Sequence, residues 1–331
     1  GSSEGPGDRR IMVTNGPITL SLGDTAQVVV GLVYGIGRNN LSSISVMKFN
    51  DASAQFAYDQ LFEVPLMPKP VVNFSELDGE ITAYWNQTAD QINITENAVH
   101  GPYDFQAYAL YQLPFGSTDI TKGTRITTFD VIDNISFLSE KVLDEQTGIV
   151  YTRPLIPLNN VEGIKRNFVF NRDYINNRDL IRGQSYTFAI TSIGYKDDPG
   201  LPSFILESAP AILNVTPQTT DPGVRLTSSI GDTITTVSRV SGGSDGWVYP
   251  IVVDPTRLTG LNYTVSFDTL PGAVVVWNVD RSDGQRVLAN QTDQLADDQS
   301  PIADGIQFRV MGAPNDFKRF SVVANGSGPL D

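Results

Sequence analysis

The sequence contains no cysteine and only one histidine, His100, among its 331 residues. Without cysteine the protein cannot form disulfides, use a thiolate in catalysis or bind a metal through sulfur. A single imidazole excludes sites that need several histidine ligands and leaves one candidate for histidine-based acid–base chemistry. Because Gly101 and Pro102 follow His100, we interpret it as a surface residue in a loop rather than as a metal ligand.

Long apolar runs and basic residues are also scarce. No run of about 18 apolar residues occurs, so the sequence predicts no membrane insertion. The chain has 23 Lys and Arg against 37 Asp and Glu, which gives a net charge of −14. An acidic surface repels phosphate backbones and anionic lipids, so we expect no nucleic-acid partner.

Glutamate is rare among the acidic residues, with 9 Glu against 28 Asp. Aspartate favours turns and caps, whereas glutamate favours helix interiors, so this balance indicates strands and loops. Alternating runs such as 81–85 and 186–191 are bounded by turn pairs such as Pro271-Gly272. With few helices between the strands, the pattern predicts a mainly β protein built from tandem antiparallel β-sandwich domains.

One helix is expected, near residues 42–62, with Ser42 or Ser43 as its N-cap. One face of this helix carries apolar residues at helical spacing. These residues are Ile44, Met47, Ala54, Tyr58 and Leu61.

Two linkers divide the chain into three segments. Pro65, Pro68 and Pro70 form the first linker, and the run 217–223 forms the second. The predicted units are therefore 1–66, 67–216 and 217–331. With neither an initiator methionine nor a signal peptide, the chain is expected to be part of a longer or processed protein.

The first segment has strand-like runs at 11–14, 18–22 and 26–34, separated by turns that include Gly23-Asp24. Such a short set of strands cannot bury its own apolar face. We therefore expect it to pack on another domain of the same protein or on a neighbouring copy, where strand addition would produce a polymer.

The middle segment contains the spacing Leu180, Gly183 and Tyr186 before a strand, with Trp85 and Tyr108 on two earlier strands. It resembles a fibronectin type III module over about residues 68–216. The resemblance implies a core tryptophan and a tyrosine corner, in which the phenol hydroxyl bonds back to the chain. The segment is larger than such a module, and the excess lies between Leu113 and Leu180.

The last segment is predicted to be a second sandwich of this immunoglobulin-like or fibronectin type III-like class. Gly260 and Tyr263 repeat a weaker form of the corner, and Trp277 lies in an apolar strand that indicates a core position. Trp247 lies beside Gly- and Ser-rich residues and is the candidate for an exposed tryptophan.

The runs 16–25, 103–105 and 314–318 are similar to stretches of very large secreted proteins of the Bacteroidetes type. This resemblance implies an extracellular, cell-surface location in bacteria and a structural role. It carries no known chemistry with it.

Acidic residues crowd one part of the last segment. They are Asp293, Asp297, Asp298 and Asp304. Oxygen ligands of this kind can bind calcium in extracellular sandwiches, although the spacing does not match an EF-hand loop. Solvated turns are the alternative, and the sequence predicts no cofactor other than this possible calcium ion.

Glycosylation signals are frequent. Eight Asn-x-Ser/Thr sequons occur, at Asn73, Asn86, Asn93, Asn134, Asn214, Asn262, Asn290 and Asn325. Three Asp-Thr-aliphatic sequences, at Thr25, Thr233 and Thr269, match an O-glycan acceptor pattern implied by the same bacterial resemblance. Turn composition at strand edges would produce the same sequences.

No catalytic residues are predicted. The run 1–5 matches Gly-x-Ser-x-Gly but lacks the preceding strand that a nucleophile elbow needs. We expect a non-catalytic structural module of an extracellular bacterial surface protein: a stalk, an adhesin or a filament subunit. The alternative is an accessory region of a large secreted hydrolase that binds carbohydrate. Expected partners are copies of the chain, neighbouring domains or glycans.

Overall fold

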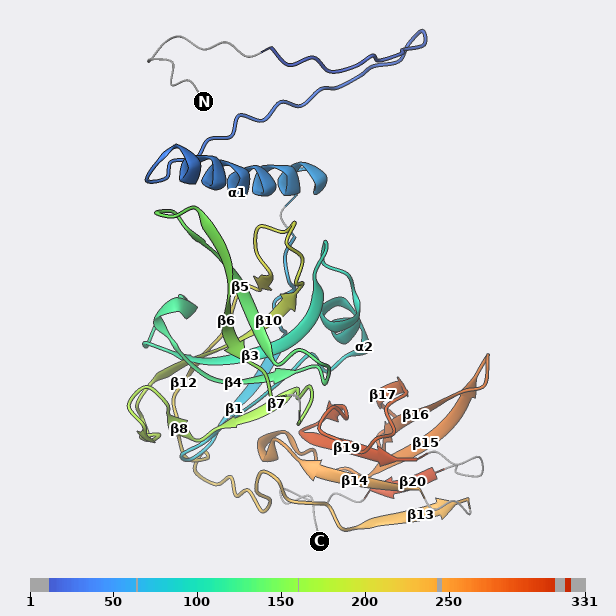
Figure 1. Ribbon diagram of the computed structural model, residues 1–331. Helices are drawn as coiled ribbons and strands as arrows, with labels where there is room; N and C mark the ends of the chain where they lie inside the picture. Colours follow the sequence, from blue (N-terminus) through green and yellow to red (C-terminus); the bar gives the residue numbers. More distant parts are fainter. Residues whose placement is uncertain (1–11, 64, 160, 243–245, 313–318, 323–331) are drawn as a thin grey trace.

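A computed structural model describes residues 12–63, 65–159, 161–242, 246–312 and 319–322. The protein is mainly β, as the alternation of the sequence predicts, and its sheets form two sandwiches, each with its own apolar core. An N-terminal arm and one long helix lie beyond the first sandwich, at the far end from the second (Figure 1).

The first sandwich pairs a three-stranded sheet with a five-stranded one, and every strand pair is antiparallel. The smaller sheet has the order β1 (Val72–Glu76), β2 (Ile81–Trp85) and β7 (Asn167–Phe170). The larger sheet contains β4 (Thr124–Asp130), β3 (Asp104–Leu113) and β10 (Tyr186–Tyr195), and β10 pairs with both β11 (Ile205–Glu207) and β12 (Ala211–Val215).

Aromatic side chains fill the space between these two sheets. Trp85 and Tyr108 are fully buried, with ring centroids 5.7 Å apart. Phe170 stacks on Phe188 across the sandwich at 4.2 Å. The hydroxyl of Tyr186 accepts a hydrogen bond of 2.9 Å from the Ile181 amide, which ties the start of β10 to the preceding turn.

That turn holds two further residues singled out by the sequence. Leu180 is buried in the same core as Trp85. Gly183 has a φ of +77°, a left-handed conformation that favours glycine.

The extra length of this sandwich forms hairpins. β5 (Phe137–Asp144) pairs with β6 (Ile149–Pro157), and β8 (Arg172–Asp173) pairs with β9 (Arg178–Asp179). The base of the β5–β6 hairpin places Leu138 and Ile156 in a further core on the outer face of the larger sheet. As a result all ten residues of β10 are buried, although the alternation at 186–191 is typical of a half-buried strand.

The second sandwich also has two antiparallel sheets. One has the order β13 (Val237–Ser241), β20 (Arg319–Val322), β15 (Tyr263–Leu270), β16 (Val274–Arg281) and β17 (Arg286–Gln291). The other has the order β14 (Trp247–Val252), β19 (Ile306–Met311) and β18 (Ile302–Ala303). Trp277 and Tyr263 are fully buried between them, and Trp247 is half-buried against the same core.

The long helix is α1 (Asn40–Asp59). Its N-cap is Asn39, because the Asn39 side chain accepts from the Ser42 amide while the Ser42 hydroxyl accepts from the Asn39 amide. The predicted cap at Ser42 or Ser43 was therefore wrong. The short helical turns are α2 (Ala89–Ile92), the π-helical η1 (Asn93–Asn97), and the 3-10 turns η2 (Ile120–Lys122) and η3 (Pro255–Arg257). Within the described residues, no helix is long and apolar enough to cross a membrane.

Candidate assembly surface

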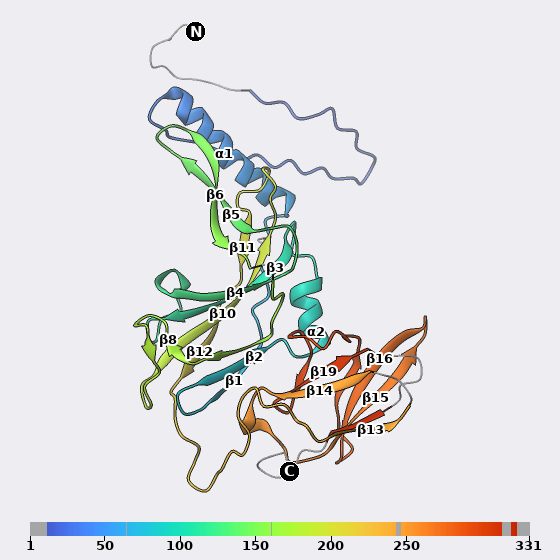
Figure 2. The same cartoon turned by 60° about the horizontal axis from the view of Figure 1, so that its bottom comes forward.

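The N-terminal arm, residues 12–39, is extended but belongs to none of the sheets in the described part of the chain. Its predicted turn forms, with the Asp24 amide donating to the Ser21 carbonyl at 3.0 Å. The two legs of the turn do not pair with each other, so the predicted runs 18–22 and 26–34 are not strands in this structure. The arm projects away from both sandwiches (Figure 2).

Large apolar side chains of the arm face solvent. Leu22, Val30 and Leu32 are at least 84% exposed. Asp24 is the only charged residue between Met12 and Ile36. An apolar surface of this kind with unpaired backbone groups is what a strand has before it joins a sheet.

The end of the arm is fixed to α1. The Asn50 side chain donates a hydrogen bond of 2.9 Å to the Tyr34 carbonyl. Gly35 lies so close to the helix that a Cβ there would be 2.2 Å from the Met47 amide nitrogen. The arm and the helix are therefore one continuous unit.

The inner face of α1 packs on the tip of the β5–β6 hairpin. A Cβ at Gly148, in the hairpin turn, would lie 2.8 Å from the Cα of Ser42. Farther along, the Lys141 ammonium lies 5.4 Å from the centre of the Phe49 ring. The buried residues of the helix are Ser42 and Val46.

The apolar face of α1 that the sequence indicates is mostly open to solvent. Ile44 is 46% exposed, Tyr58 is 49% exposed, and Leu61, just beyond the helix, is 81% exposed. This outer face and the apolar arm together form the candidate assembly surface.

Polar contacts join the two sandwiches directly. The Arg166 guanidinium forms two hydrogen bonds with the Glu96 carboxylate, at 2.8 and 2.7 Å, and a third with the Gln299 carbonyl of the second sandwich at 2.8 Å. Glu96 also accepts from the Tyr108 hydroxyl at 2.7 Å. The Arg166 and Glu96 side chains are only 11% and 9% exposed.

Burial by itself would lower the pKa of Arg166, but the hydrogen bonds and charge of Glu96 outweigh it and raise the pKa. Burial, followed by the charge of Glu96, raises the pKa of Tyr108. The ion pair and its hydrogen bonds therefore link the two sandwiches.

Further contacts extend the junction. The Ser75 hydroxyl bonds to the buried Asp254 carboxylate at 2.6 Å, and the Thr82 hydroxyl donates to the Val253 carbonyl at 2.8 Å. These contacts from β1 and β2 hold the second sandwich in one orientation, in addition to the linker at 217–223.

Asp298 makes an ion pair across the junction with Lys165, at 2.9 Å, and a second with Arg309. Burial would raise the pKa of Asp298, but hydrogen bonding to Lys165 and the charge of Arg309 lower it below its usual value. Asp298 therefore adds stability above its unfolded pKa of about 3.9. That stability is lost as the pH falls through the depressed folded value.

Replacing Asp298 with asparagine is expected to destabilise the protein by about 1 kcal/mol at pH 7, as for a partly exposed ion pair. The difference from wild type should shrink as the pH falls below about 3.9. Urea unfolding at pH 7 and pH 3 measures it, with Asp297→Asn as a neighbouring control. An unchanged difference at the two pH values would contradict this assignment.

The predicted calcium ligands do not converge. Asp293 accepts from the Ser300 hydroxyl and the Leu295 amide, and Asp297 accepts from the Gln299 amide. Asp298 is ion-paired as above, and Asp304 accepts from Tyr263 and Arg281. Among the described residues, no three His, Cys, Asp or Glu side chains are grouped for a metal. Calcium remains a prediction from the sequence.

Most of the predicted acceptor residues for glycans are exposed. They are Thr25, Thr233, Thr269, Asn73, Asn93, Asn134, Asn214, Asn262 and Asn290. Asn86 differs, because it is buried and its amide nitrogen donates to the Thr95 and Tyr108 hydroxyls. A glycan on that nitrogen is incompatible with the folded module. Asn325 lies outside the described residues.

Of the remaining candidates from the sequence, only His100 lies within the described residues. His100 is half-buried and forms a β-bridge with Tyr103, whose hydroxyl donates to the Ser203 carbonyl. The Gly-x-Ser-x-Gly match at 1–5 and the run 314–318 lie outside the described residues. Sequence analysis missed Arg166 and Glu96, which are 70 residues apart and carry no local signature.

No family model, curated protein or solved structure matches this chain.

Proposed function

We propose that the chain is a non-catalytic structural module of an extracellular bacterial surface protein: a stalk, an adhesin or a filament subunit. The observation that carries this proposal is the apolar arm, which has strand composition and unpaired legs. Such a segment gains most by adding its backbone to the edge of another β-sheet. The neighbouring sheet belongs to another copy of the chain or to an adjoining domain of the parent protein.

Two features of the sandwiches support the structural role. The buried Arg166–Glu96 pair and the contacts of Asp254 favour a fixed angle between the sandwiches, which suits a load-bearing stalk. The bond from the Ile181 amide to the Tyr186 hydroxyl fits a fibronectin type III-like module. The acidic composition keeps such a protein soluble.

The arm is tested by measuring assembly. We expect the full chain to form species larger than its 36.1 kDa monomer, seen by light scattering and electron microscopy. The double variant Val30→Lys, Leu32→Lys should return it to monomer, because a charge on each side chain cannot enter an apolar interface. Val161→Lys, at a position 76% exposed outside the arm, is the matched control.

A wild-type chain that is monomeric at all concentrations would contradict self-assembly. Docking to an adjoining domain of the parent protein would then be the remaining form of the proposal. Assembly that the double variant Val30→Lys, Leu32→Lys leaves unchanged would contradict the role of the arm itself.

A further inference from the structure

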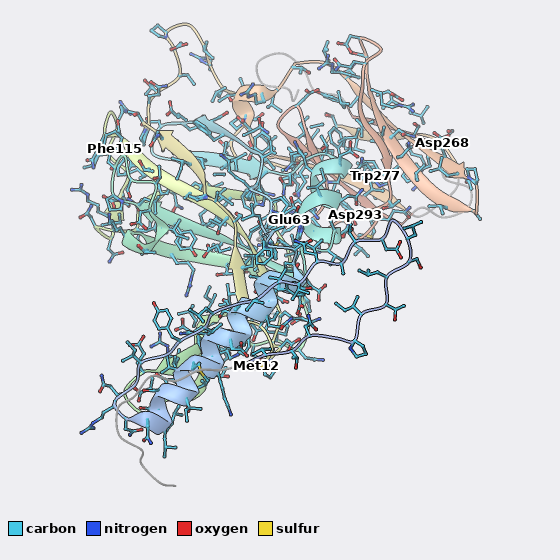
Figure 3. All side chains as sticks on the ribbon, turned by 90° about the horizontal axis from the view of Figure 1, so that it is seen from above. Met12, Glu63, Phe115, Asp268, Trp277 and Asp293 are labelled. Atoms are coloured by element: carbon cyan, nitrogen blue, oxygen red, sulfur yellow. The ribbon has the colours of Figure 1, made fainter. Side chains whose placement is uncertain are left out.

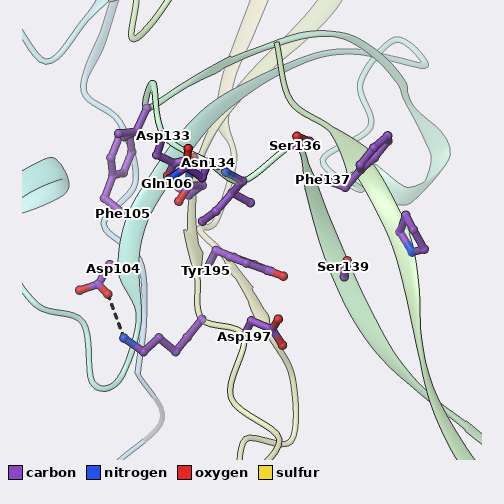
Figure 4. A pocket seen from close by; sticks show the side chains of 14 residues that line it. Asp104, Phe105, Gln106, Asp133, Asn134, Ser136, Phe137, Ser139, Tyr195 and Asp197 are labelled. Carbon is purple, nitrogen blue, oxygen red and sulfur yellow. Dashed lines mark hydrogen bonds and ion pairs between the residues drawn. The ribbon is translucent and has the colours of Figure 1, made fainter. Parts of the chain in front are cut away.

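A groove lies between the β5–β6 hairpin and the adjacent ends of β3 and β10 (Figure 4). Its volume is about 700 Å³, which is within the range of about 300–1,000 Å³ typical of ligand pockets. No described residue of the arm or of α1 lines it. A ligand there would therefore be bound independently of the assembly surface.

A second cavity of about 490 Å³ adjoins this groove, because both are lined by Phe105 and Val131. The second cavity continues past Glu96 to Gln299 of the second sandwich. The second cavity therefore lies beside the groove, at the junction of the two sandwiches.

The hairpin side of the groove is apolar and partly open. Phe137, on β5, is 50% exposed although it is a large aromatic residue on a strand. Pro154 of β6, which is paired with Ser139, also lines the groove. Tyr195, at the end of β10, points into the space between the two sides (Figure 4). An exposed ring in a cavity offers a flat apolar surface for stacking.

The opposite side of the groove is polar. Asp133 is held by the Gln106 amide at 2.9 Å and the Ile135 amide at 2.7 Å, and Asp104 is paired with Lys196 at 3.3 Å. Asn134 and Asp197 are exposed at the rim. These groups both donate and accept hydrogen bonds, and the three carboxylates give the lining a net negative charge.

We propose that this groove binds a neutral oligosaccharide. The apolar face of a sugar ring stacks on Phe137 while its hydroxyl groups bond to the amide and carboxylates opposite. The negative lining repels sulfated sugars and uronic acids, so the ligand is uncharged. The groove volume of about 700 Å³ accommodates a short oligosaccharide.

Isothermal titration and saturation-transfer NMR of the full chain with cellohexaose, xylohexaose, mannohexaose and N-acetylchitohexaose test the proposal. At least one of them should bind saturably in the micromolar to millimolar range. Phe137→Ala should weaken that binding about tenfold, whereas Phe137→Tyr should retain it. Phe115→Ala, which removes a 68% exposed ring outside the groove, should have no effect.

Absence of saturable binding by all four sugars at millimolar concentration would overturn the proposal, as would binding that Phe137→Ala leaves unchanged. An acidic, aromatic groove could instead bind a cationic peptide, and hexalysine is the probe for that ligand class. Binding of hexalysine without binding of any sugar would also overturn it. The lysine variants of the arm should bind the sugar normally, so failure of the groove and failure of the arm are distinguishable.

Discussion

Replacing Arg166 with methionine is expected to lower the free energy of unfolding by about 3–5 kcal/mol. The substitution leaves the buried Glu96 carboxylate with the Tyr108 hydroxyl but without its cation, and it leaves the Gln299 carbonyl without its donor. Equilibrium unfolding in urea, followed by circular dichroism at pH 7, measures the loss. Because Arg166 joins the two sandwiches, we also expect them to unfold more independently of each other in the variant than in the wild type.

Two further variants show whether burial is the cause. Adding Glu96→Gln to Arg166→Met removes the unpaired charge and should recover part of the stability. Arg182→Met breaks an ion pair with Asp78 whose side chains are 61% and 49% exposed, and it should cost at most about 1 kcal/mol. A loss below about 1 kcal/mol for Arg166→Met would mean that the pair does not hold the junction.

The sequence predicted the fold class because alternation is a local signal. Trp85 and Trp277 lie on apolar strands and are core residues of separate sandwiches. The same alternation suggests an exposed polar face on β10, but Thr187 and Thr191 of that face are buried. Their burial comes from the far face of the sheet, which the β5–β6 hairpin covers, and local alternation carries no information about such a cover.

Local sequence patterns were also insufficient to predict the candidate assembly surface. Periodicity identified the residues that share a face of α1, but not which face would meet the rest of the protein. The tip of the hairpin packs on the face of Ser42 and Ser45, where small side chains allow close approach. The outer apolar face, with Ile44 and Tyr58, is then left exposed to solvent. The junction residues were not predictable, because their pairing depends on how two separate sandwiches meet.

Replacing Trp277 with alanine is expected to destabilise the second sandwich by about 3–5 kcal/mol, since the side chain is fully buried in its core. The effect should extend beyond the cavity. The indole Nε1 of Trp277 donates to the Asp293 carbonyl at 2.5 Å (Figure 3), which anchors the start of the acidic segment that contains Asp298. Hydrogen exchange should therefore accelerate across residues 293–300, and urea unfolding measures the overall loss.

The contribution of that hydrogen bond can be separated from the loss of volume, because the two core tryptophans differ. The indole nitrogen of Trp85 is buried and has no acceptor among the described residues. Trp85→Phe therefore costs only packing, whereas Trp277→Phe costs packing and leaves the Asp293 carbonyl unpaired, an additional loss of about 1–3 kcal/mol. Equal losses, with unchanged exchange at residues 293–300, would show that Trp277 fills the core without anchoring the segment. A larger loss for Trp277→Phe would tie the core of the second sandwich to the ion pair between Asp298 and Lys165.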